Sequence, residues 1–305
     1  MVKAEVEIVL DAVIVCVSDA TPRILTTLTA DRTHSLPSGV LKDSDRTIEE
    51  ALRRWVREQT SLELGYVEQL YTFGDRDRVV KTDSGEKRLL SIAYLALIRE
   101  EKPSDSAEWI DLYKFFPWED HRKANASDNN LAIKELLQPF ILNGLEEDRQ
   151  VRSERTRIMF SSDESLFDAV RSLDRYELLF EASLLPESNR SDKTEFVMQD
   201  PLQAKSMHLD HRRIAATALE RIRGKLSYRP VVFELLPAKF TLLELQTVVE
   251  ALSGERLHKQ NFRRLVESAG LVVGTSEMAA TKGRPAELFE FRREVLQERP
   301  RPGVR

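Results

Sequence analysis

The side chains best suited to molecular recognition lie in the segment LHKQNFRRLVESAGLV. Apolar residues recur there at helical spacing and predict the buried face of a helix, made of Phe262, Leu265, Val266 and Ala269. The polar side chains then point away from the core, namely Lys259, Gln260, Asn261, Arg263, Arg264 and Glu267. Arg forms two hydrogen bonds with guanine, and Asn or Gln does the same with adenine, so this face suits base edges in a DNA major groove.

The elements around this helix predict a winged helix-turn-helix. A preceding helix begins after Thr241, where a capping box with Glu244 marks its N-terminus, and it ends at Gly254. Two strands follow, and their basic connecting loop TKGRP places Lys282 and Arg284 where a wing contacts the DNA backbone or a minor groove. The alternative is an amphipathic helix whose polar face is only solvated.

The segments LHKQNFRRLVESAGLV and GRPAELFEF resemble the C-terminal winged helix of the Nudix-related transcriptional regulators of NAD metabolism, the NrtR group and the longer NadQ-like proteins. The resemblance extends from about His208 almost to the C-terminus. It implies a DNA-binding module whose partner is a double-stranded operator.

Charge is unevenly distributed along the chain. Residues 201–305 contain 19 Lys and Arg against 12 Asp and Glu, a net charge of +7, while the whole chain carries −5. The first 200 residues therefore carry −12. A basic C-terminal third suits a module that binds a polyanion, attached to an acidic part with another role.

Cysteine use and hydropathy indicate a reducing, aqueous compartment. Cys16 is the only cysteine, which excludes an intramolecular disulfide or a Cys-based zinc cluster, and its apolar surroundings AVIVCVS predict a buried thiol. No run of about 18 apolar residues and no cleavable signal segment occurs. We therefore expect a soluble, cytoplasmic protein without a membrane partner.

The N-terminal part predicts a mixed sheet with one helix. The β-like runs lie at residues 5–18, 24–29, 66–73 and 89–98. A turn is predicted at residues 36–39, and Thr47, in a capping box with Glu50, starts a helix that runs to Thr60. This order of elements resembles a Nudix domain and, with the helical part and winged helix that follow, implies an α+β fold.

The Nudix box is matched only in part. The residues that agree with the family pattern are Gly39, Arg54, Val56, Glu58 and Leu62. Trp55 and Gln59 stand where the family has Glu, and Ser61 stands where it has Gly. An extra residue upstream leaves Asp45 or Arg46 near the place of the remaining Glu.

These departures remove most of the carboxylates with which the family holds divalent cations. Glu58 alone does not make the multi-metal array that positions water for attack on a pyrophosphate. We therefore predict no catalytic residue, no resident metal and no cofactor, and we take Arg54 and Glu58 as candidates for effector binding. The alternative for this pair is an ion pair at i, i+4 spacing on the helix surface.

The segment YTFGDRDR, residues 71–78, resembles the ADP-ribose-type branch of the Nudix superfamily. The resemblance implies that Phe73 stacks on an aromatic base, that Arg76 and Arg78 meet phosphates and that Asp77 meets a ribose hydroxyl. The alternative is the end of a strand running into a solvated hairpin.

Helical patterns at residues 127–145 and from Ser165 onward predict a connector over residues 126–206, with a charged stretch between the helices and a polar loop at 186–195. Its apolar faces are natural dimer contacts. The aromatic segment 108–118 is predicted to pack in the core.

A further helix is predicted around His208 and His211, whose i, i+3 spacing raises a zinc interpretation. No third or fourth ligand follows at a recognisable spacing, so a structural role is favoured. Arg221, Arg223 and Lys225 then form a basic edge that would add phosphate contacts.

These patterns together divide the chain into a Nudix-like effector-sensing domain (1–125), the helical connector (126–206) and a winged helix-turn-helix (207–305). The favoured function is a homodimeric repressor of genes for NAD synthesis or salvage, which senses a nucleotide of the ADP-ribose, NAD or ATP class. One alternative is an active hydrolase of nucleoside diphosphate derivatives with an accessory winged helix. Another is a winged helix that binds protein and not DNA.

Overall fold

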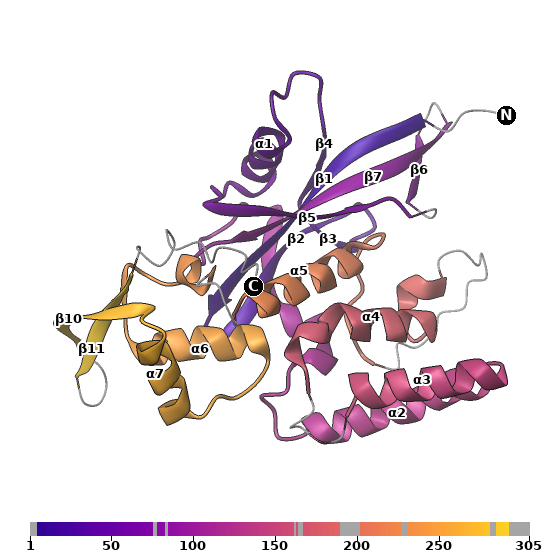
Figure 1. Ribbon diagram of the computed structural model, residues 1–305. Coiled ribbons are helices and arrows are strands. Elements are labelled where there is room, and N and C mark those ends of the chain that lie inside the picture. The colour runs from indigo at the N-terminus through magenta and orange to yellow at the C-terminus, as the bar shows by residue number, and fades with distance from the viewer. Residues whose placement is uncertain are drawn as a thin grey trace, which may run out of the picture.

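The computed structural model describes residues 5–75, 78–82, 85–161, 163, 167–189, 202–226, 231–280 and 285–292 (Figure 1). Within these ranges a mixed eight-stranded sheet follows the path β3-β2-β1-β7-β5, onto which β4, β6 and β8 pair. The strands are β1 (Glu5–Ser18), β2 (Thr21–Leu28), β3 (His34–Ser35), β4 (Ser38–Val40), β5 (Tyr66–Phe73), β6 (Val79–Thr82), β7 (Gly85–Leu97) and β8 (Ala107–Asp111). β1 and β7 run parallel, whereas β1 and β2 form an antiparallel hairpin, so the predicted mixed sheet is confirmed.

Strand β1 lies between two hydrophobic cores, because successive side chains of a strand point to opposite faces of the sheet. Leu10 and Ile14 belong to the smaller core, and Val13 and Val15 belong to the larger one. Cys16 is fully buried, and burial raises the pKa of its thiol to about 12. The predicted structural role of this cysteine is confirmed.

Helix α1 (Ile48–Thr60) covers the smaller core, in which Leu52 and Val56 are buried. Thr47 caps the helix as predicted, because its hydroxyl accepts the Glu50 N–H at 3.1 Å. The helix therefore begins and ends where the sequence predicts.

Further helices lie on the other side of the sheet, namely α2 (Ala126–Leu142), α3 (Glu146–Met159), α4 (Ser172–Glu181) and α5 (His211–Leu226). Of these, α5 contacts β1, β5 and β7, and α4 and the α2–α3 hairpin lie beyond it (Figure 1). Short 3-10 helices connect them, namely η1 (Leu112–Lys114), η2 (Pro117–Glu119), η4 (Ala169–Arg171), η5 (Pro186–Asn189) and η6 (Val231–Leu235). Figure 1 shows α1 at one end of the molecule, the α2–α3 hairpin at the other, and α5 across the middle. The larger core is continuous from the sheet through these helices into the C-terminal part, so the three predicted domains share it.

The connector differs from the prediction in three places. The charged stretch after Leu145, placed between two helices in the prediction, is itself a helix, α3. The long helix predicted from Ser165 is replaced by η4 and the ten-residue α4. In the predicted polar loop, Glu187 is buried at 6% exposure, because Arg212 of α5 binds its carboxylate at 2.6 Å. Residues 190–195 of that loop lie outside the described ranges.

The aromatic segment packs in the core, as predicted. Residues 107–111 form β8, which pairs with β2 and closes one side of the sheet. Phe115, Phe116 and Trp118 then turn into the larger core, and Tyr113 beside them is buried as well.

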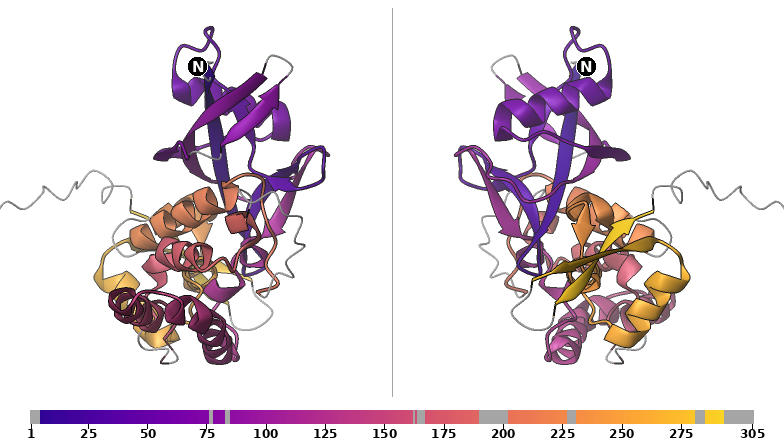
Figure 2. Two further views of the ribbon diagram at one scale, coloured as in Figure 1. Left: turned by 90° about the vertical axis from the view of Figure 1, so that its right-hand side faces the viewer. Right: turned by 90° about the vertical axis from the view of Figure 1, so that its left-hand side faces the viewer.

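The C-terminal part is a winged helix, which Figure 2 shows beside the sheet. Its elements are β9 (Lys239–Phe240), α6 (Leu242–Ser253), α7 (Lys259–Ser268), β10 (Val272–Ala279) and β11 (Ala286–Phe291). The capping box of Thr241 and Glu244 is present, and Gly254 ends α6 in the left-handed region at φ 78°. β9 adds a third strand, in the order β10-β11-β9. None of the helices in the described part of the chain has the length and apolar character that a membrane span requires.

Candidate functional site

The exposed face of α7 carries the side chains predicted to recognise DNA. They are Lys259, Gln260, Asn261, Arg263 and Arg264, all of which are exposed. Phe262 and Val266 are 9% and 8% exposed and anchor the opposite face in the core. Within the described ranges, no hydrogen bond or ion pair engages the guanidinium groups of Arg263 and Arg264. Their donors therefore face solvent from a helix whose apolar side is fixed.

The buried face of α7 is narrower than predicted. Leu265 is 62% exposed and Ala269 is exposed as well, so both predicted core positions are wrong. Ala269 caps the end of the ten-residue helix, and Leu265 lies beside exposed Arg264 on the polar side. Strands β10 and β11 confirm the predicted wing, although Lys282 and Arg284 lie outside the described residues.

The predicted basic edge of α5 is wrong as a phosphate-binding surface. Arg223 is 2% exposed and ion-pairs with Glu119. Lys225 and Arg221 both pair with Glu68 of β5. These cations form ion pairs inside the protein, and the pairs hold α5 against the sheet and η2.

In helix α1, the two positions at which Trp55 and Gln59 stand in place of the family's Glu are used for packing. Gly39 lies in β4 and pairs with β1, so the turn predicted at residues 36–39 is wrong in its second half. A Cβ atom on Gly39 would lie 2.0 Å from the ring of Trp55, which therefore covers this glycine directly. Trp55 Nε1 also donates to the Val40 carbonyl at 2.8 Å. Gln59 accepts the Ser38 N–H at 3.2 Å and donates to the Ser38 carbonyl at 2.5 Å.

Arg54 and Glu58 are placed on the outer side of the same helix. Arg54 donates from Nε and Nη2 to the Asp45 carboxylate at about 3 Å, whereas its Nη1 lies 3.5 Å from the Glu58 carboxylate. Hydrogen bonds from Arg54 lower the pKa of Asp45 below its ordinary value. The guanidinium also lies 4.8 Å from the centroid of the Trp55 ring. The i, i+4 ion pair considered for Arg54 is thus the weaker of its two carboxylate contacts.

Arg78 belongs to a buried ionic cluster, here called the Asp11 cluster. Its guanidinium, 2% exposed, lies 3.2 Å from Asp11 and ion-pairs with Asp210 just before α5. The hydroxyls of Ser38 and Ser91 donate to the Asp11 carboxylate. Sequence reasoning missed Asp11, although a lone Asp inside the apolar run IVLDAVIV was a usable signal.

Electrostatics within the cluster keep Asp11 ionised. Burial alone raises the pKa of Asp11, but His211, Arg78 and the two serine hydroxyls outweigh it, so the pKa lies below its ordinary value. Burial raises the pKa of Asp210 against the attraction of Arg78. The Leu36 N–H donates to His211 Nδ1 at 3.0 Å, and Nε2 faces Asp11 at 3.7 Å.

The two histidines do not share a helical face, because α5 begins at His211 and His208 precedes it. Their rings meet edge to face at 5.6 Å. In the described part of the chain no group of three His, Cys, Asp or Glu side chains is arranged to hold a metal ion.

Of the remaining effector candidates, the structure describes Phe73. Phe73 is 7% exposed in the larger core, and its ring meets Tyr71 edge to face at 5.7 Å. The predicted stacking of this ring on a base therefore requires the core to open. Arg76 and Asp77 lie outside the described residues.

Two family models match the chain. The NUDIX domain model matches residues 9–137, and the model of the NrtR DNA-binding winged helix domain matches residues 232–291. A curated relative, the ADPR responsive transcriptional repressor NtrR of Acinetobacter baylyi, is 32% identical over 101 residues, which is 33% of this chain. The match spans 40% of that relative's length.

Solved structures show the same arrangement of elements. Shewanella oneidensis NrtR complexed with a 27mer DNA has a TM-score of 0.56 and 20% identity, over 95% of both chains. A MutT/nudix family protein from Enterococcus faecalis has a TM-score of 0.52 and 15% identity, over 95% of this chain and 88% of that one. These likenesses establish the fold as a Nudix sheet followed by a winged helix.

Proposed function

Because the chain joins a Nudix domain to an NrtR DNA-binding winged helix domain, we propose that it is a DNA-binding transcriptional repressor of genes for NAD synthesis or salvage. The observation that carries the proposal is the exposed polar face of α7, formed by Lys259, Gln260, Asn261, Arg263 and Arg264. These side chains supply bidentate base contacts and phosphate contacts from one helix. The curated relative is an ADPR responsive transcriptional repressor, which supports the same function.

The proposed effector is a nucleotide of the ADP-ribose, NAD or ATP class, bound by the Nudix domain. The name of the curated relative favours ADP-ribose. The residues proposed to bind it are Arg54, Glu58, Phe73, Arg76, Asp77 and Arg78. Arg78 is the one through which binding would reach the rest of the molecule.

We propose that an effector phosphate competes with Asp210 for Arg78. Asp210 directly precedes α5, and that helix ion-pairs through Arg223 with Glu119 and packs against α6. Loss of the Arg78 contact would release the start of α5 and so change the placement of the winged helix. By linkage, an effector that weakens DNA binding must itself bind less tightly to the DNA complex.

Hydrolysis is the less favoured function. The positions at which the family carries metal-binding Glu hold Trp55 and Gln59, and both side chains are engaged with β4. Glu58 remains half exposed, and one carboxylate does not form a two-metal site. Magnesium-dependent turnover of ADP-ribose that disappears in Glu58→Gln would support the hydrolase instead.

A homodimer fits the proposed function. Two copies of α7 placed about 34–36 Å apart, or a multiple of this distance, would read a palindromic operator. Light scattering of the free protein and of its DNA complex would measure the stoichiometry.

The test of the proposed function is fluorescence anisotropy with DNA from promoters of NAD genes, at about 0.15 M salt. We expect the protein to prefer this DNA to an unrelated duplex of equal length, and ADP-ribose, NAD or ATP to change the affinity. Equal binding to both duplexes at all promoters, without a nucleotide effect, would refute the repressor.

A further inference from the structure

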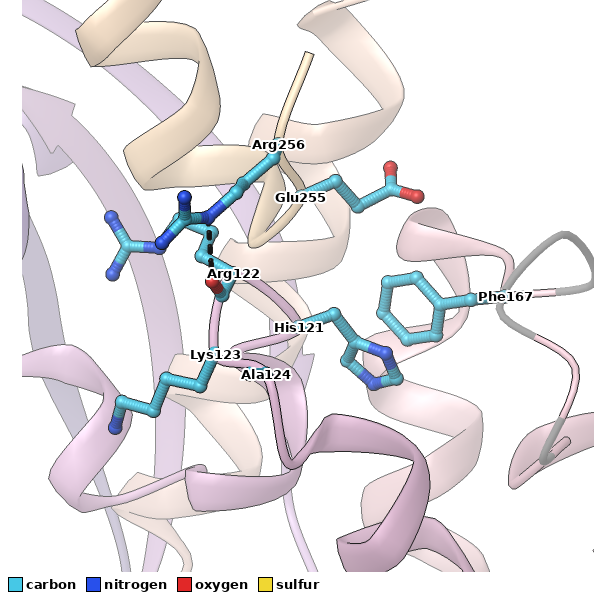
Figure 3. Close-up of a pocket in the computed structure, with 7 residues that line it drawn as sticks. All are labelled: His121, Arg122, Lys123, Ala124, Phe167, Glu255 and Arg256. Carbon is cyan, nitrogen blue, oxygen red and sulfur yellow. Dashed lines mark hydrogen bonds between the residues drawn. The ribbon is translucent and has the colours of Figure 1, made fainter.

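A cavity of about 590 Å³ lies between the loop that joins η2 to α2 and the turn that joins α6 to α7 (Figure 3). Residues 121–124 line one side, and Glu255 and Arg256 line the opposite side. Phe167 closes a third side. The volume is that of a small-molecule site. None of the proposed effector residues that the structure describes lines this cavity.

The lining is predominantly cationic. Arg122, Lys123 and Arg256 contribute three positive charges, against the single carboxylate of Glu255. Asp120 lies outside the lining and pairs with both Arg122, at 2.7 Å, and Lys123, at 3.5 Å. One positive charge in excess therefore remains even when Asp120 is included.

Arg256 is held in a position from which it can reach a ligand. Its Nε donates to the Arg122 carbonyl at 2.7 Å, the bond drawn in Figure 3. This bond uses the inner nitrogen of the guanidinium and, among the residues that the structure describes, leaves the two terminal nitrogens for an anion. Guanidinium groups bind phosphate oxygens in this forked geometry.

His121 supplies a polar atom that lacks a partner in the described part of the chain. Its Nδ1 is buried without a hydrogen bond, and its ring stacks on Phe167 with 3.6 Å between centroids. Burial lowers the pKa of His121, and of the charges around it Glu119 opposes the shift whereas Arg175 and Arg223 add to it. His121 and Phe167 therefore form a stacked aromatic wall of the cavity, in which Nδ1 is covered.

The floor of the cavity is rigid. Gly254 at φ 78° packs so closely that a Cβ atom would lie 2.2 Å from the Glu119 carbonyl oxygen. Arg223 donates to the Leu252 and Glu119 carbonyls, each at 3.0 Å, and thereby joins α6 to η2. The two lining segments are therefore fixed relative to each other without a ligand.

We propose that this cavity is a second anion site, which takes a small diffusible molecule bearing a phosphate or pyrophosphate group. Arg256 lies three residues before the first residue of α7. An anion held between Arg256 and Lys123, whose side chains point to the same side in Figure 3, thus fixes the entry to the recognition helix. This site acts in addition to the proposed nucleotide effector and does not depend on it.

The test is isothermal titration of the full-length protein with pyrophosphate in the absence of DNA, so that its result is independent of the proposed repressor function. We expect Arg256→Gln to weaken binding about tenfold, since it removes a charged hydrogen-bond donor. Glu255→Gln should tighten binding, because it removes the one carboxylate among the described residues of the lining. Arg99→Gln, an exposed arginine after β7, is the matched control and should leave the affinity unchanged.

Two results would overturn the proposal. One is the absence of binding, or binding that neither Arg256→Gln nor Glu255→Gln alters. The other is found when Arg256→Gln binds pyrophosphate like the parent but its DNA binding depends less on salt. The expected decrease in that dependence is about one phosphate contact. In that second case the cations of the lining contact the DNA backbone.

Discussion

At the scale of single residues, Trp55 and Gln59 show how two positions at which the family pattern has Glu take part in packing here. Both replace carboxylates with neutral side chains that bond to the backbone of β4. The replacement of Glu was visible in the sequence, but the new contacts were not. Trp55 finds its partner 16 residues upstream, at Gly39, through a strand pairing that no local pattern reveals.

Reintroducing the family residue should therefore destabilise the fold and not restore an enzyme. Trp55→Glu removes the ring from Gly39 and the hydrogen bond to Val40, and we expect the free energy of unfolding to fall by about 2 kcal/mol. Urea denaturation measures this change, and a magnesium-dependent assay with ADP-ribose should detect no turnover. Glu58→Gln, on the exposed side, is the control and should change stability by less than about 0.5 kcal/mol. Unchanged stability of Trp55→Glu would contradict the packing role.

Substitution of a base-reading residue on α7 should change DNA binding differently from substitution of a phosphate-binding residue. Arg263→Ala should cost about 1–3 kcal/mol of operator affinity and relax the preference at one base pair. Lys259→Ala, at the helix N-terminus, should weaken binding to all sequences alike and reduce the salt slope by about one. Anisotropy with single-base operator variants at several salt concentrations separates the two. If Arg263→Ala binds every duplex like the parent, α7 does not read the operator.

At the scale of elements, helices with caps and apolar periodicity could be predicted, and those held by charges could not. The capping box at Thr241 and the left-handed Gly254 fix both ends of α6 from local sequence alone. Helix α3 has no apolar stripe and buries only Thr156 and Met159. Surface ion pairs such as Arg157 with Glu154 link its side chains instead. Such a helix has no hydrophobic periodicity by which the sequence could predict it.

Buried arginines joining distant elements were equally invisible. Glu119 of η2 binds Arg175 of α4 at 2.6 Å and also pairs with Arg223 of α5, and all three side chains are almost fully buried. Each arginine lies tens of residues or more from Glu119 in the chain. From the sequence, each cation therefore looked like a solvated surface charge. These contacts set the order in which α4, α5 and α6 pack around η2.

Glu119→Gln should test that arrangement. The substitution preserves the shape of the side chain but leaves two buried guanidinium groups without a counter-charge, which typically costs about 3–5 kcal/mol. Thermal and urea denaturation should both show the loss. Glu154→Gln, in the exposed pair on α3, should leave the transition where it is. A stable Glu119→Gln protein would mean that water or a rearranged carboxylate compensates these cations.

At the scale of the whole molecule, the continuous larger core predicts cooperative unfolding. The chain has three Trp, at positions 55, 109 and 118, all within the Nudix match, whereas many of the helices lie C-terminal to it. Tryptophan fluorescence and far-ultraviolet circular dichroism should therefore give coincident transitions. Two separated transitions would show that the domains predicted from the sequence unfold independently.

Stability should fall at acidic pH. The pKa values of Asp11 and Glu119 lie below their ordinary values of 3.8 and 4.5, because neighbouring cations outweigh the effect of burial. Their stabilising contribution is complete above those ordinary values and is lost as the pH falls through the lowered pKa values. Asp210, whose pKa is raised, acts in the opposite direction. Unfolding measured between pH 6 and about 3 should show the loss, and Asp11→Asn should flatten it; an identical slope would exclude Asp11 as a contributor.

The burial of Cys16 has a practical consequence for spectroscopy. With a pKa of about 12 and no exposed surface, this thiol is a poor target for maleimide or nitroxide reagents at neutral pH. The native chain should therefore stay unlabelled when a reagent is directed at an introduced cysteine. Cysteines introduced at exposed Val273 in β10 and exposed Val151 in α3 could carry a donor and an acceptor dye. Energy transfer between them would follow the winged helix directly as nucleotide or DNA is added.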